Sequence, residues 1–349
     1  MSSKNFETVR QAKLIAKKKI RRGTFKWLEA GAEDGLTTTT NIDFLNSIKF
    51  LPRILSKNNN VKINTKFLSK EISSPLMLCP MGHQTQFTKF GEIDTAKGVQ
   101  LTGSVGFFST QGRQSLQNIR KKNKKTNLVW QIFLFGNKSW ILKQIINAEK
   151  NNCLALSICL DAPVRSHRYL DREINYDARK FGTRTQPVPP DVSKALDYDW
   201  EIIKWIKKKT KLPLILKGIL NVQDAVLAKK YGSNILWVSN HGGRMVNSGI
   251  SSGEALIKIR QKLGYKIPII VDGGVRRGSD IAKYLSLGAN YVGIGRPAMY
   301  GLIINKGIGV NKIFSILNNE LLTFMKNSGC KNLRDLNLRK LIISKNQIL

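Results

Sequence analysis

The sequence predicts an α/β protein: a (β/α)8 TIM barrel with an N-terminal helical extension and a long loop after the fourth strand. Two observations predict this fold. Eight short apolar segments recur from residue 75 onward, each followed by a stretch typical of a helix. Most of these segments have a polar residue near their C-terminal end. We expect one domain over residues 1–349, with the extension at 1–74, the barrel at 75–300 and C-terminal helices at 301–349.

The extension is expected to begin with a helix over about residues 7–32. A threonine-rich turn, TTTTN, is expected at residues 37–41, since hydroxyl side chains compete with the backbone hydrogen bonds of a helix.

The eight apolar segments are expected to be the barrel strands. They are PLMLCP (75–80), VGFFST (105–110), LVWQIF (128–133), LSICLDAP (156–163), PLILKGI (213–219), ILWVSNH (235–241), IPIIVDGG (267–274) and YVGIGRP (291–297). Continuous apolar strands that alternate with helices are typical of a parallel sheet covered on both faces, and eight such units close a barrel. The residues at their C-terminal ends should meet on one face, where barrels place their active sites. These residues are Ser109, Gln131, Asp161, Lys217, His241, Asp272 and Arg296.

Residues 164–197 separate the fourth strand from the fifth and contain RKFGTRTQPVPPD without clear periodicity. Long segments of this kind in compact domains are usually lids or binding loops. We therefore expect a loop over the mouth of the barrel.

The chain is strongly basic, with 58 Lys and Arg against 23 Asp and Glu, a formal net charge of +35. These charges are spread along the whole chain, whereas a nucleic-acid footprint must be localised. A main role in nucleic-acid binding is therefore disfavoured. Secondary contacts with acidic partners or a membrane surface stay open.

No apolar run reaches 18 residues, and MSSKNFETVRQAKLIAKKKIRRG at the start lacks the apolar core of a signal peptide. The four cysteines have no metal-ligand spacing. We expect a soluble cytoplasmic protein with reduced thiols and no metal site.

Two glycine and arginine elements, VDGGVRRGSD (271–280) and GIGRP (293–297), end the last two strands. Glycines let backbone N–H groups approach an anion, and the following helix directs its positive end toward it. A tight strand-to-helix turn is the alternative for either element alone. Their occurrence on adjacent final strands favours a phosphate site.

His241 lies at the end of the sixth segment, and Asp161, at the end of the fourth, could hold its imidazole. Arg244 and Arg168 could bind a carboxylate. Lys217 could stabilise an anionic ring system or, alternatively, form a Schiff base. His83 and His167 are interpreted as structural, with His167 as a candidate lining residue of the mouth.

Several motifs, in this order, resemble the FMN-dependent α-hydroxy acid oxidase and dehydrogenase family, which includes glycolate and lactate oxidases. They are AGAEDGLTTTTN (30–41), PRIL (52–55), FGEIDTAKG (90–98), FFSTQGRQSL (107–116), LDAPVRSHR (160–168), LKGI (216–219), SNHGGR (239–244), DGGVRRGSD (272–280) and GRPAMYGL (295–302).

The resemblance implies FMN as cofactor and oxidation of an (S)-2-hydroxy acid to the 2-oxo acid, with electrons passing to flavin N5 and then to oxygen or to a protein or quinone acceptor. It also implies a homotetramer. It places the catalytic base on His241, the partner of this base on Asp161, and the substrate-carboxylate arginines on Arg168 and Arg244, with Trp27 and Phe133 in the substrate pocket. The residues expected to contact FMN are Pro80, Met81, Gly82, Ser109, Gln131, Cys159, Lys217, Ser239, Asp272, Gly273, Gly274, Arg276, Gly295 and Arg296.

The chain departs from the family at several pocket positions. Trp27 and Phe133 replace two tyrosines, Cys159 replaces a threonine, and Gln111 replaces an aromatic residue at the mouth. The loss of two hydroxyl donors should weaken binding of small hydroxy acids. The opening segment also resembles the premycofactocin synthase branch, so a larger, peptide-derived or amine-like substrate is the alternative. Because that branch tends to lose the arginine that this chain retains as Arg244, a 2-hydroxy acid is preferred.

Overall fold

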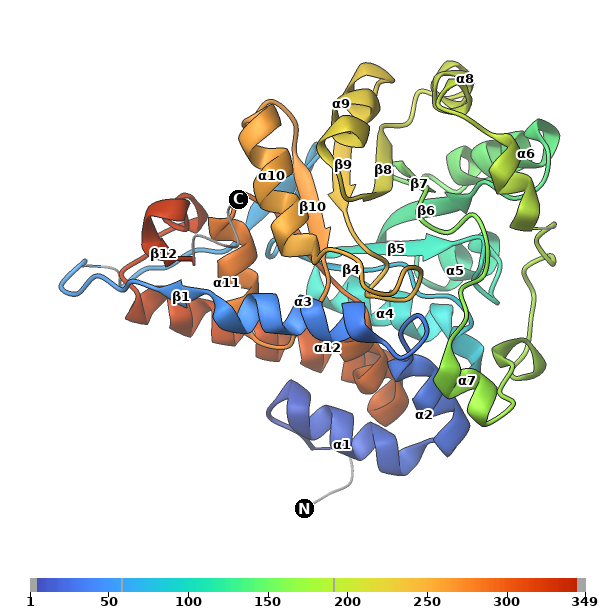
Figure 1. The fold of residues 1–349 in the computed structure, drawn as a ribbon. Coiled ribbons are helices and arrows are strands. Elements are labelled where there is room, and N and C mark those ends of the chain that lie inside the picture. The colour runs from blue at the N-terminus through green and yellow to red at the C-terminus, as the bar shows by residue number, and fades with distance from the viewer. Residues whose placement is uncertain (1–4, 58, 191, 344–349) are drawn as a thin grey trace.

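Eight parallel strands close into a barrel at the centre of the computed structural model, which describes residues 5–57, 59–190 and 192–343 (Figure 1). The strands are β4 (Leu76–Leu78), β5 (Val105–Ser109), β6 (Asn127–Phe133), β7 (Leu156–Cys159), β8 (Leu214–Ile219), β9 (Ile235–Val238), β10 (Ile269–Asp272) and β11 (Tyr291–Ile294). Each pairs in parallel with its neighbour in sequence, and β11 pairs with β4 to complete the ring. The predicted (β/α)8 TIM barrel is confirmed: seven strands lie within their predicted segments, and β6 begins one residue before its own.

The barrel interior is filled by large side chains, as a packed core requires. Phe107 and Trp237 are fully buried, with their rings 4.5 Å apart. A hairpin of β2 (Thr65–Phe67) and β3 (Lys70–Ile72) closes the end of the barrel opposite the pocket described below, where Phe67 packs against Phe107 and Tyr291. That end is therefore sealed, and access is left to the C-terminal ends of the strands.

Helices surround the barrel. They are α4 (Glu92–Thr102), α5 (Leu116–Lys122), α6 (Lys138–Lys150), α8 (Glu201–Lys209), α9 (Val222–Lys230), α10 (Ser252–Leu263), α11 (Gly278–Ser286) and α12 (Arg296–Asn327). Polar caps fix several starts: Asn221 accepts from the third backbone N–H of α9, and Ser251 and Glu254 form a capping box at α10. Helix α12 contains a kink at Asn305 and Lys306, whose backbone angles are not helical.

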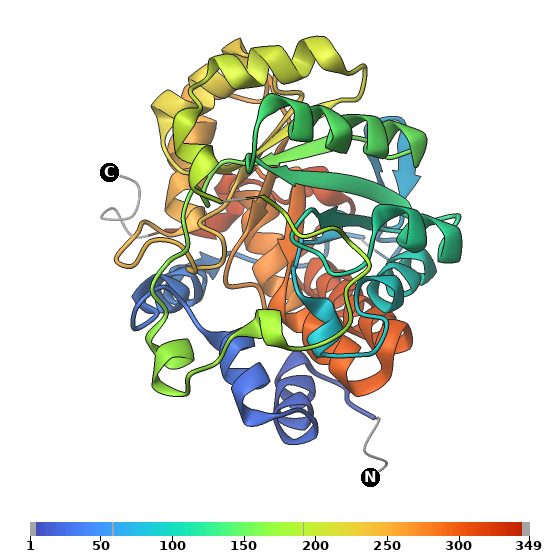
Figure 2. The same ribbon diagram turned by 90° about the vertical axis from the view of Figure 1, so that its right-hand side faces the viewer.

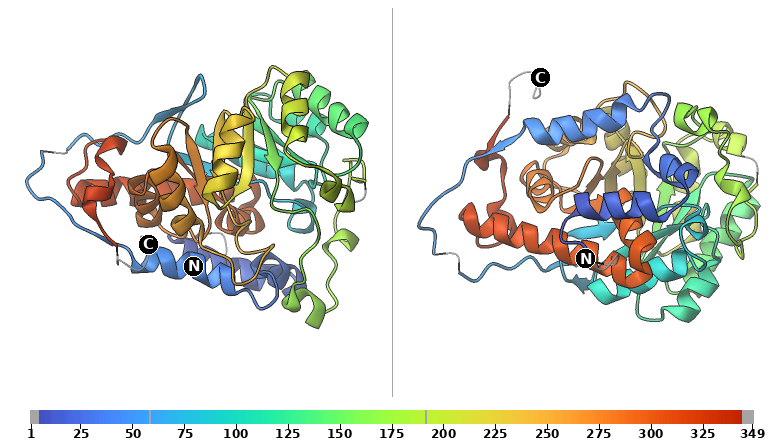
Figure 3. Two further views of the ribbon diagram at one scale, coloured as in Figure 1. Left: turned by 45° about the horizontal axis from the view of Figure 1, so that its top comes forward. Right: turned by 90° about the horizontal axis from the view of Figure 1, so that it is seen from below.

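The N-terminal extension forms three helices, α1 (Val9–Lys19), α2 (Arg22–Glu29) and α3 (Leu36–Ser47). The expected helix over 7–32 is divided in two, and the view from below shows α1 beside α12 (Figure 3). The prediction of a turn at TTTTN is wrong, since this segment lies inside α3. Thr40 returns a hydrogen bond to the Leu36 carbonyl within the helix, while Thr37 and Thr38 donate to carbonyls of the loop after β9. Tertiary contacts thus outweigh the weak helix propensity of threonine.

The segment after β7 crosses the face of the barrel, as predicted for 164–197 (Figure 2). It is not wholly irregular, because it includes α7 (Tyr169–Glu173) and short 3-10 turns. The backbone of Glu33 forms a parallel bridge with Arg168, and the Tyr169 N–H donates to the Glu33 carbonyl. The extension therefore anchors this loop beside the mouth.

The expected C-terminal helices reduce to α12 followed by short 3-10 turns. β12 (Leu341–Ile342) then pairs antiparallel with β1 (Lys49–Phe50) of the extension, and residues 344–349 lie outside the described part. Within the described ranges, no helix combines the length and the apolar character needed to cross a membrane.

Candidate active site

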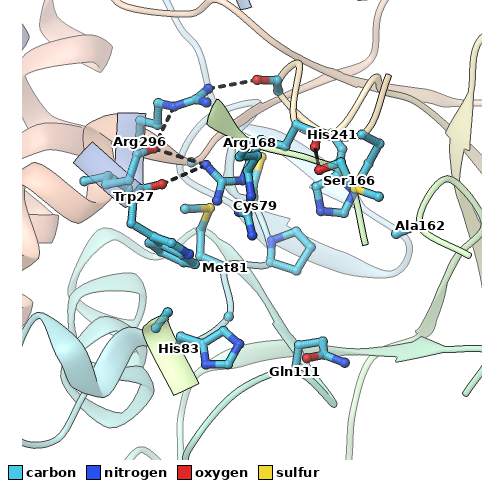
Figure 4. A pocket seen from close by; sticks show the side chains of 18 of the residues that line it. Trp27, Cys79, Met81, His83, Gln111, Ala162, Ser166, Arg168, His241 and Arg296 are labelled. Atoms are coloured by element: carbon cyan, nitrogen blue, oxygen red, sulfur yellow. Dashed lines mark hydrogen bonds between the residues drawn. The ribbon is translucent and has the colours of Figure 1, made fainter. Parts of the chain in front are cut away.

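A cavity of about 760 Å³ opens at the C-terminal ends of the strands (Figure 4). Its walls combine strand ends, the loop after β7 and Trp27 of α2. Ser109, Lys217, His241 and Asp272 line it together, as the sequence predicts for the C-terminal face of a barrel.

His241 lies on a tight turn directly after β9. His241, Gly242 and Gly243 all have left-handed backbone conformations, with φ of 57°, 63° and 74°. A side chain at Gly243 would place its Cβ 2.4 Å from the Thr38 nitrogen, so only glycine fits there. The turn is held by the His241 N–H, which donates to the Ser239 hydroxyl. The motif thus aims an imidazole into the cavity from a rigid backbone.

A reciprocal amide pair supports the same turn. The side-chain nitrogen of Asn41 donates to the Asn240 oxygen, and that of Asn240 donates to the Asn41 oxygen, both at 2.9 Å in a buried position. Neither residue is among the site residues expected from the sequence. Asn240 could have been identified from its position directly before His241. Asn41 lies 199 residues away in the chain, and only the fold brings the two side chains together.

Asp161 links the two functional groups predicted to flank it. Its Oδ1 lies 3.0 Å from His241 Nδ1, and its Oδ2 lies 3.4 Å from Lys217 Nζ. The Lys217 and Asp161 side chains are only 3% and 9% exposed. Because Nδ1 faces the carboxylate, Nε2 of His241 is the nitrogen left for a substrate.

The charges of this group stabilise one another. Burial alone would raise the pKa of Asp161, but Lys217 and His241 outweigh it and hold the pKa of this carboxyl well below its ordinary value. Burial likewise disfavours the ammonium of Lys217, yet Asp161 and Asp272 raise the pKa of Lys217 above its ordinary value. Lys217 therefore stays charged, which argues against the Schiff-base alternative, since that chemistry needs the free amine.

A buried chain of polar contacts continues from Lys217. Its Nζ donates to the Ser239 hydroxyl at 2.9 Å, and Ser239 donates to Asp272 at 2.9 Å. Cys79 contacts Asp272 and Cys159 contacts Asp161; burial raises the pKa of both thiols. Ligand atoms of Cys159, Asp161 and His241 lie within 4.8 Å of one another. The thiol of Cys159 is protonated and the carboxylate of Asp161 is already paired with Lys217. We therefore interpret this group as a hydrogen-bonded network and not as a metal site.

The two arginines predicted to bind a carboxylate meet at Trp27. The guanidinium carbon of Arg244 lies 4.9 Å from the Trp27 ring centre, and that of Arg168 lies 5.9 Å from it. Arg244 Nη1 donates to the carbonyls of Trp27 and Ala30, and Arg168 Nε pairs with Asp171 at 3.1 Å. Burial and the neighbouring arginines hold the pKa of Arg244 well below its ordinary value. The guanidiniums of Arg244 and Arg168 repel each other, and an anion between them would reduce this repulsion.

The predicted phosphate site lies between β10 and α11. Gly273 and Gly274 have φ of 110° and 77°. The backbone N–H groups of Arg276 and Arg277 donate to Asp280, which caps the helix start. Arg276 lines the cavity, and its described side-chain hydrogen bond goes only to the Val275 carbonyl, so its guanidinium retains free donors.

Arg296, the second arginine expected to bind the phosphate, also makes contacts within the protein. It lines the cavity, but its Nε, Nη1 and Nη2 donate to the carbonyls of Leu28, Gly242 and Ala30, each at 3.0 Å. Most of its donors therefore hold α2 and the His241 turn against the barrel, and Arg276 is the arginine better placed for a phosphate.

The remaining expected cofactor contacts surround the same cavity. Pro80, Met81, Gly82 and Gly295 line it, and a Cβ at Gly295 would press on the Met81 sulfur at 3.1 Å. Gln131 is buried, and its side-chain oxygen finds no hydrogen-bond donor among the described residues. A ring N–H, which a flavin offers, is the kind of partner that this oxygen lacks. The donor set and the phosphate-type turn therefore fit FMN.

Phe133 and Trp27 form the apolar parts of the wall, both 7% exposed. The Phe133 ring lies 6.3 Å from that of His241, and the Trp27 ring lies 6.0 Å from that of His83. His167, taken as a candidate mouth residue, does line the cavity, as does His83, which we had interpreted as structural only.

The chain matches the family model described as FMN-dependent dehydrogenase over residues 16–343. It is 32% identical over 332 residues to 2-hydroxyacid oxidase 2 of Homo sapiens, covering 92% of this chain and 94% of that protein. It is 31% identical over 343 residues to L-lactate oxidase of Nostoc sp., with 92% and 94% covered. A crystal structure of mandelate oxidase superposes with a TM-score of 0.89 at 25% identity, covering 97% of this chain and 98% of that one.

The matched region contains both the histidine turn and the phosphate-type turn, and the cavity between them fits the cofactor that the family is named for. The chain therefore belongs to the FMN-dependent dehydrogenase family and is an FMN-dependent oxidoreductase.

Proposed function

We propose that this protein oxidises an (S)-2-hydroxy acid to the 2-oxo acid and passes the electrons from FMN to oxygen. FMN-dependent oxidation of 2-hydroxy acids is the activity of its relatives, among them 2-hydroxyacid, lactate and glycolate oxidases. The observation that carries the proposal is that His241, held by Asp161, lines the same cavity as Arg244 and Arg168. It sets a proton acceptor beside a site for the carboxylate of the same substrate.

In this proposal each side chain has one task. Arg244 and Arg168 bind the carboxylate and orient the C2 carbon, and Nε2 of His241 takes a proton from the substrate. Asp161 stabilises the imidazolium that results, an interaction of about 1.5–3 kcal/mol for a charge-assisted hydrogen bond. FMN supplies the redox chemistry by accepting two electrons, and Lys217 keeps a positive charge at its site.

The residues proposed to hold FMN include eleven that line the cavity: Pro80 to Gly82, Ser109, Lys217, Asp272 to Gly274, Arg276, Gly295 and, in part, Arg296. Gln131, Cys159 and Ser239, which are buried, complete the proposed set. A peptide-derived or amine-like substrate is not favoured, since the relatives reported above are hydroxy acid oxidases and the carboxylate-type arginine pair is retained.

The experiment that tests the proposal is to purify the protein, identify bound flavin by its absorbance, and follow anaerobic bleaching with a panel of 2-hydroxy acids. Bleaching by the (S) but not the (R) acids, followed by reoxidation in air, supports it. A flavin-loaded protein that no 2-hydroxy acid bleaches would exclude it.

Trp27 and Phe133 support a finer proposal on substrate size. Without the two phenolic donors, glycolate and lactate should be poor substrates, and acids with a longer or aryl side chain should gain from the apolar wall. Second-order bleaching constants for lactate and 2-hydroxyoctanoate compare the two cases directly. A clear advantage for lactate would reject the proposal.

We also propose that residues 1–349 act as one domain, assemble as a homotetramer and work in the cytoplasm. All four cysteines are buried and unpaired, which suits a reducing compartment. Multi-angle light scattering across working concentrations tests the assembly: the 39.3 kDa mass of one chain would reject the tetramer. Cell fractionation tests the location.

A further inference from the structure

The loop after β7 carries an unusual kind of positive charge. Of the 58 basic residues in the chain, only 18 are arginine, but between residues 164 and 186 five of six are arginine. They are Arg165, Arg168, Arg172, Arg179 and Arg184, with Lys180 as the sixth. A general bias toward lysine therefore does not explain this loop. Arginine binds carboxylates and phosphates in a bidentate manner, as lysine does not.

Four of the five arginines have partners within the protein. Arg168 pairs with Asp171 and Arg179 with Asp177. Arg184 donates to the carbonyls of Gln186 and Pro187, and Arg172 contacts the His167 ring.

Arg165 is different. It lines the cavity and is exposed, and among the described residues it forms neither a hydrogen bond nor an ion pair. It lies three residues before Arg168, one of the two proposed carboxylate ligands.

His83 adds a neutral donor to the same part of the cavity. Its Nδ1 accepts a hydrogen bond from Arg113 Nε at 3.3 Å, so the ring proton is on Nε2. Burial, followed by the charges of Arg113, Arg184 and Arg165, lowers the pKa of His83 to about 3. The ring is therefore uncharged at neutral pH, and Arg165 is close enough to influence it.

Gln111 completes this group. Gly82 packs directly on Gln111, since a Cβ there would lie 3.0 Å from the Gln111 carbonyl oxygen. Figure 4 shows the side chains of Trp27, His83, Gln111 and His241 around the same cavity. Trp27 contacts Arg244 and Arg168 as well as His83, so one indole ring separates the carboxylate site from this outer group.

We propose that the substrate has a second anionic group, a carboxylate or a phosphate, at the end of its side chain, and that Arg165 binds this group at the mouth with His83 and Gln111 as neutral partners. The proposal rests on the proposed function, because it assigns the far end of the same 2-hydroxy acid. The apolar faces of Trp27 and Phe133 then contact the carbon chain between the two charged ends.

The test compares acids of equal shape and different charge. Anaerobic bleaching constants are measured on the holoenzyme for (S)-2-hydroxyglutarate and for 2-hydroxy-5-methylhexanoate, its uncharged isostere. We expect the diacid to react at least about tenfold faster, the effect of 1.4 kcal/mol. The (S) forms of malate and 2-hydroxyadipate bracket the chain length, and L-3-phosphoglycerate, which is the (S) form, distinguishes phosphate from carboxylate.

Variants assign the effect to Arg165. Arg165→Gln should abolish the preference for the second charge, and Arg165→Lys should retain part of it. Arg334→Gln, an exposed arginine in the C-terminal part of the chain, removes the same charge and should leave the preference unchanged. Calorimetric titration of 2-oxoglutarate into the oxidised holoenzyme gives a readout independent of turnover, and Arg165→Gln should weaken this binding about tenfold.

The outcomes separate the two proposals. If 2-hydroxy acids bleach the flavin but the diacid has no advantage over its isostere, or if Arg165→Gln keeps the advantage, the second-anion proposal is overturned and the proposed function stands. If no 2-hydroxy acid bleaches the flavin, the proposed function itself fails.

Discussion

At the scale of single residues, the site depends on charges held in place by other charges. Asp161 is ionised because Lys217 and His241 offset its burial, and Lys217 stays cationic because Asp161 and Asp272 offset its own. Removing one member of a buried charged pair typically costs about 3–5 kcal/mol, since the other is left uncompensated. The residues that carry the chemistry are therefore also part of the stability of the barrel mouth.

His241→Ala is expected to retain FMN and lose substrate oxidation. The imidazole is proposed to act only in proton transfer, whereas the cofactor contacts lie elsewhere in the cavity. General-base catalysis contributes about 10²–10⁴-fold, so the anaerobic bleaching constant should fall at least that far. Flavin content per chain, measured by absorbance, is the control. Bleaching at near the parent rate would show that another group is the base.

His83 predicts a dependence of stability on pH. Its pKa is lowered to about 3 in the folded protein, against an ordinary value of about 6.5 when unfolded. Between these values the unfolded chain binds the extra proton, so the free energy of unfolding decreases as pH falls below about 6.5. Between pH 7 and pH 5, the free energy of unfolding of the His83→Gln protein should decrease by about 1–2 kcal/mol less than that of the parent protein.

Urea unfolding of both proteins at pH 7 and pH 5 measures this difference. His167→Gln is the matched control, because His167 is exposed. An equal decrease in the free energy of unfolding between pH 7 and pH 5 in the parent and the His83→Gln protein would contradict the prediction.

At the scale of elements, the N-terminal extension forms part of the active-site wall. Helix α2 supplies Trp27 and the carbonyls that bind Arg244 and Arg296. Helix α3 supplies Asn41 and Thr38, which pack on the His241 turn. The turn, α2 and α3 therefore behave as one unit, and a change at their contact should reach the imidazole.

Gly243→Ala tests this contact. The added Cβ would meet the Thr38 nitrogen at 2.4 Å, on a residue with φ of 74°. We expect a loss of about 2–4 kcal/mol in unfolding free energy and a fall in the bleaching constant, because the His241 turn must move. Gly103→Ala, with φ of 66° and its nearest neighbour at 3.7 Å, has the backbone cost alone and should lose only about 1 kcal/mol. Equal losses in both variants would argue against the contact.

At the scale of the whole molecule, the net charge of +35 should attract anionic substrates. Salt screens such attraction, since the Debye length is about 10 Å at 0.1 M ionic strength. We expect the bleaching constant for a 2-hydroxy acid to fall several-fold between about 0.02 and 0.3 M sodium chloride. Circular dichroism over the same range controls for unfolding. A constant that does not change with salt would show that the charge has no role in substrate capture.

The barrel, and the face of it that carries the candidate site, can be predicted from the sequence alone. Eight apolar segments, most of them with a polar residue near the C-terminal end, are enough to predict a closed parallel sheet, because continuous apolar strands are typical of a sheet buried on both faces. The segments ending at Asp161, Lys217 and His241 could be assigned to one face for the same reason: parallel strands point their C-terminal ends the same way.

Features that depend on contacts between distant segments could not be predicted without the fold. TTTTN is helical because its hydroxyls bond to the loop after β9, a contact that local propensity does not contain. Arg296 is turned toward the carbonyls of α2, although its motif is typical of a phosphate ligand. Arg165 lines the mouth because the loop after β7 folds over it, and a loop without periodicity gives no indication of where its side chains lie. For TTTTN and Arg296 the deciding contacts come from partners more than 200 residues away in the chain, and no short window of sequence contains both partners.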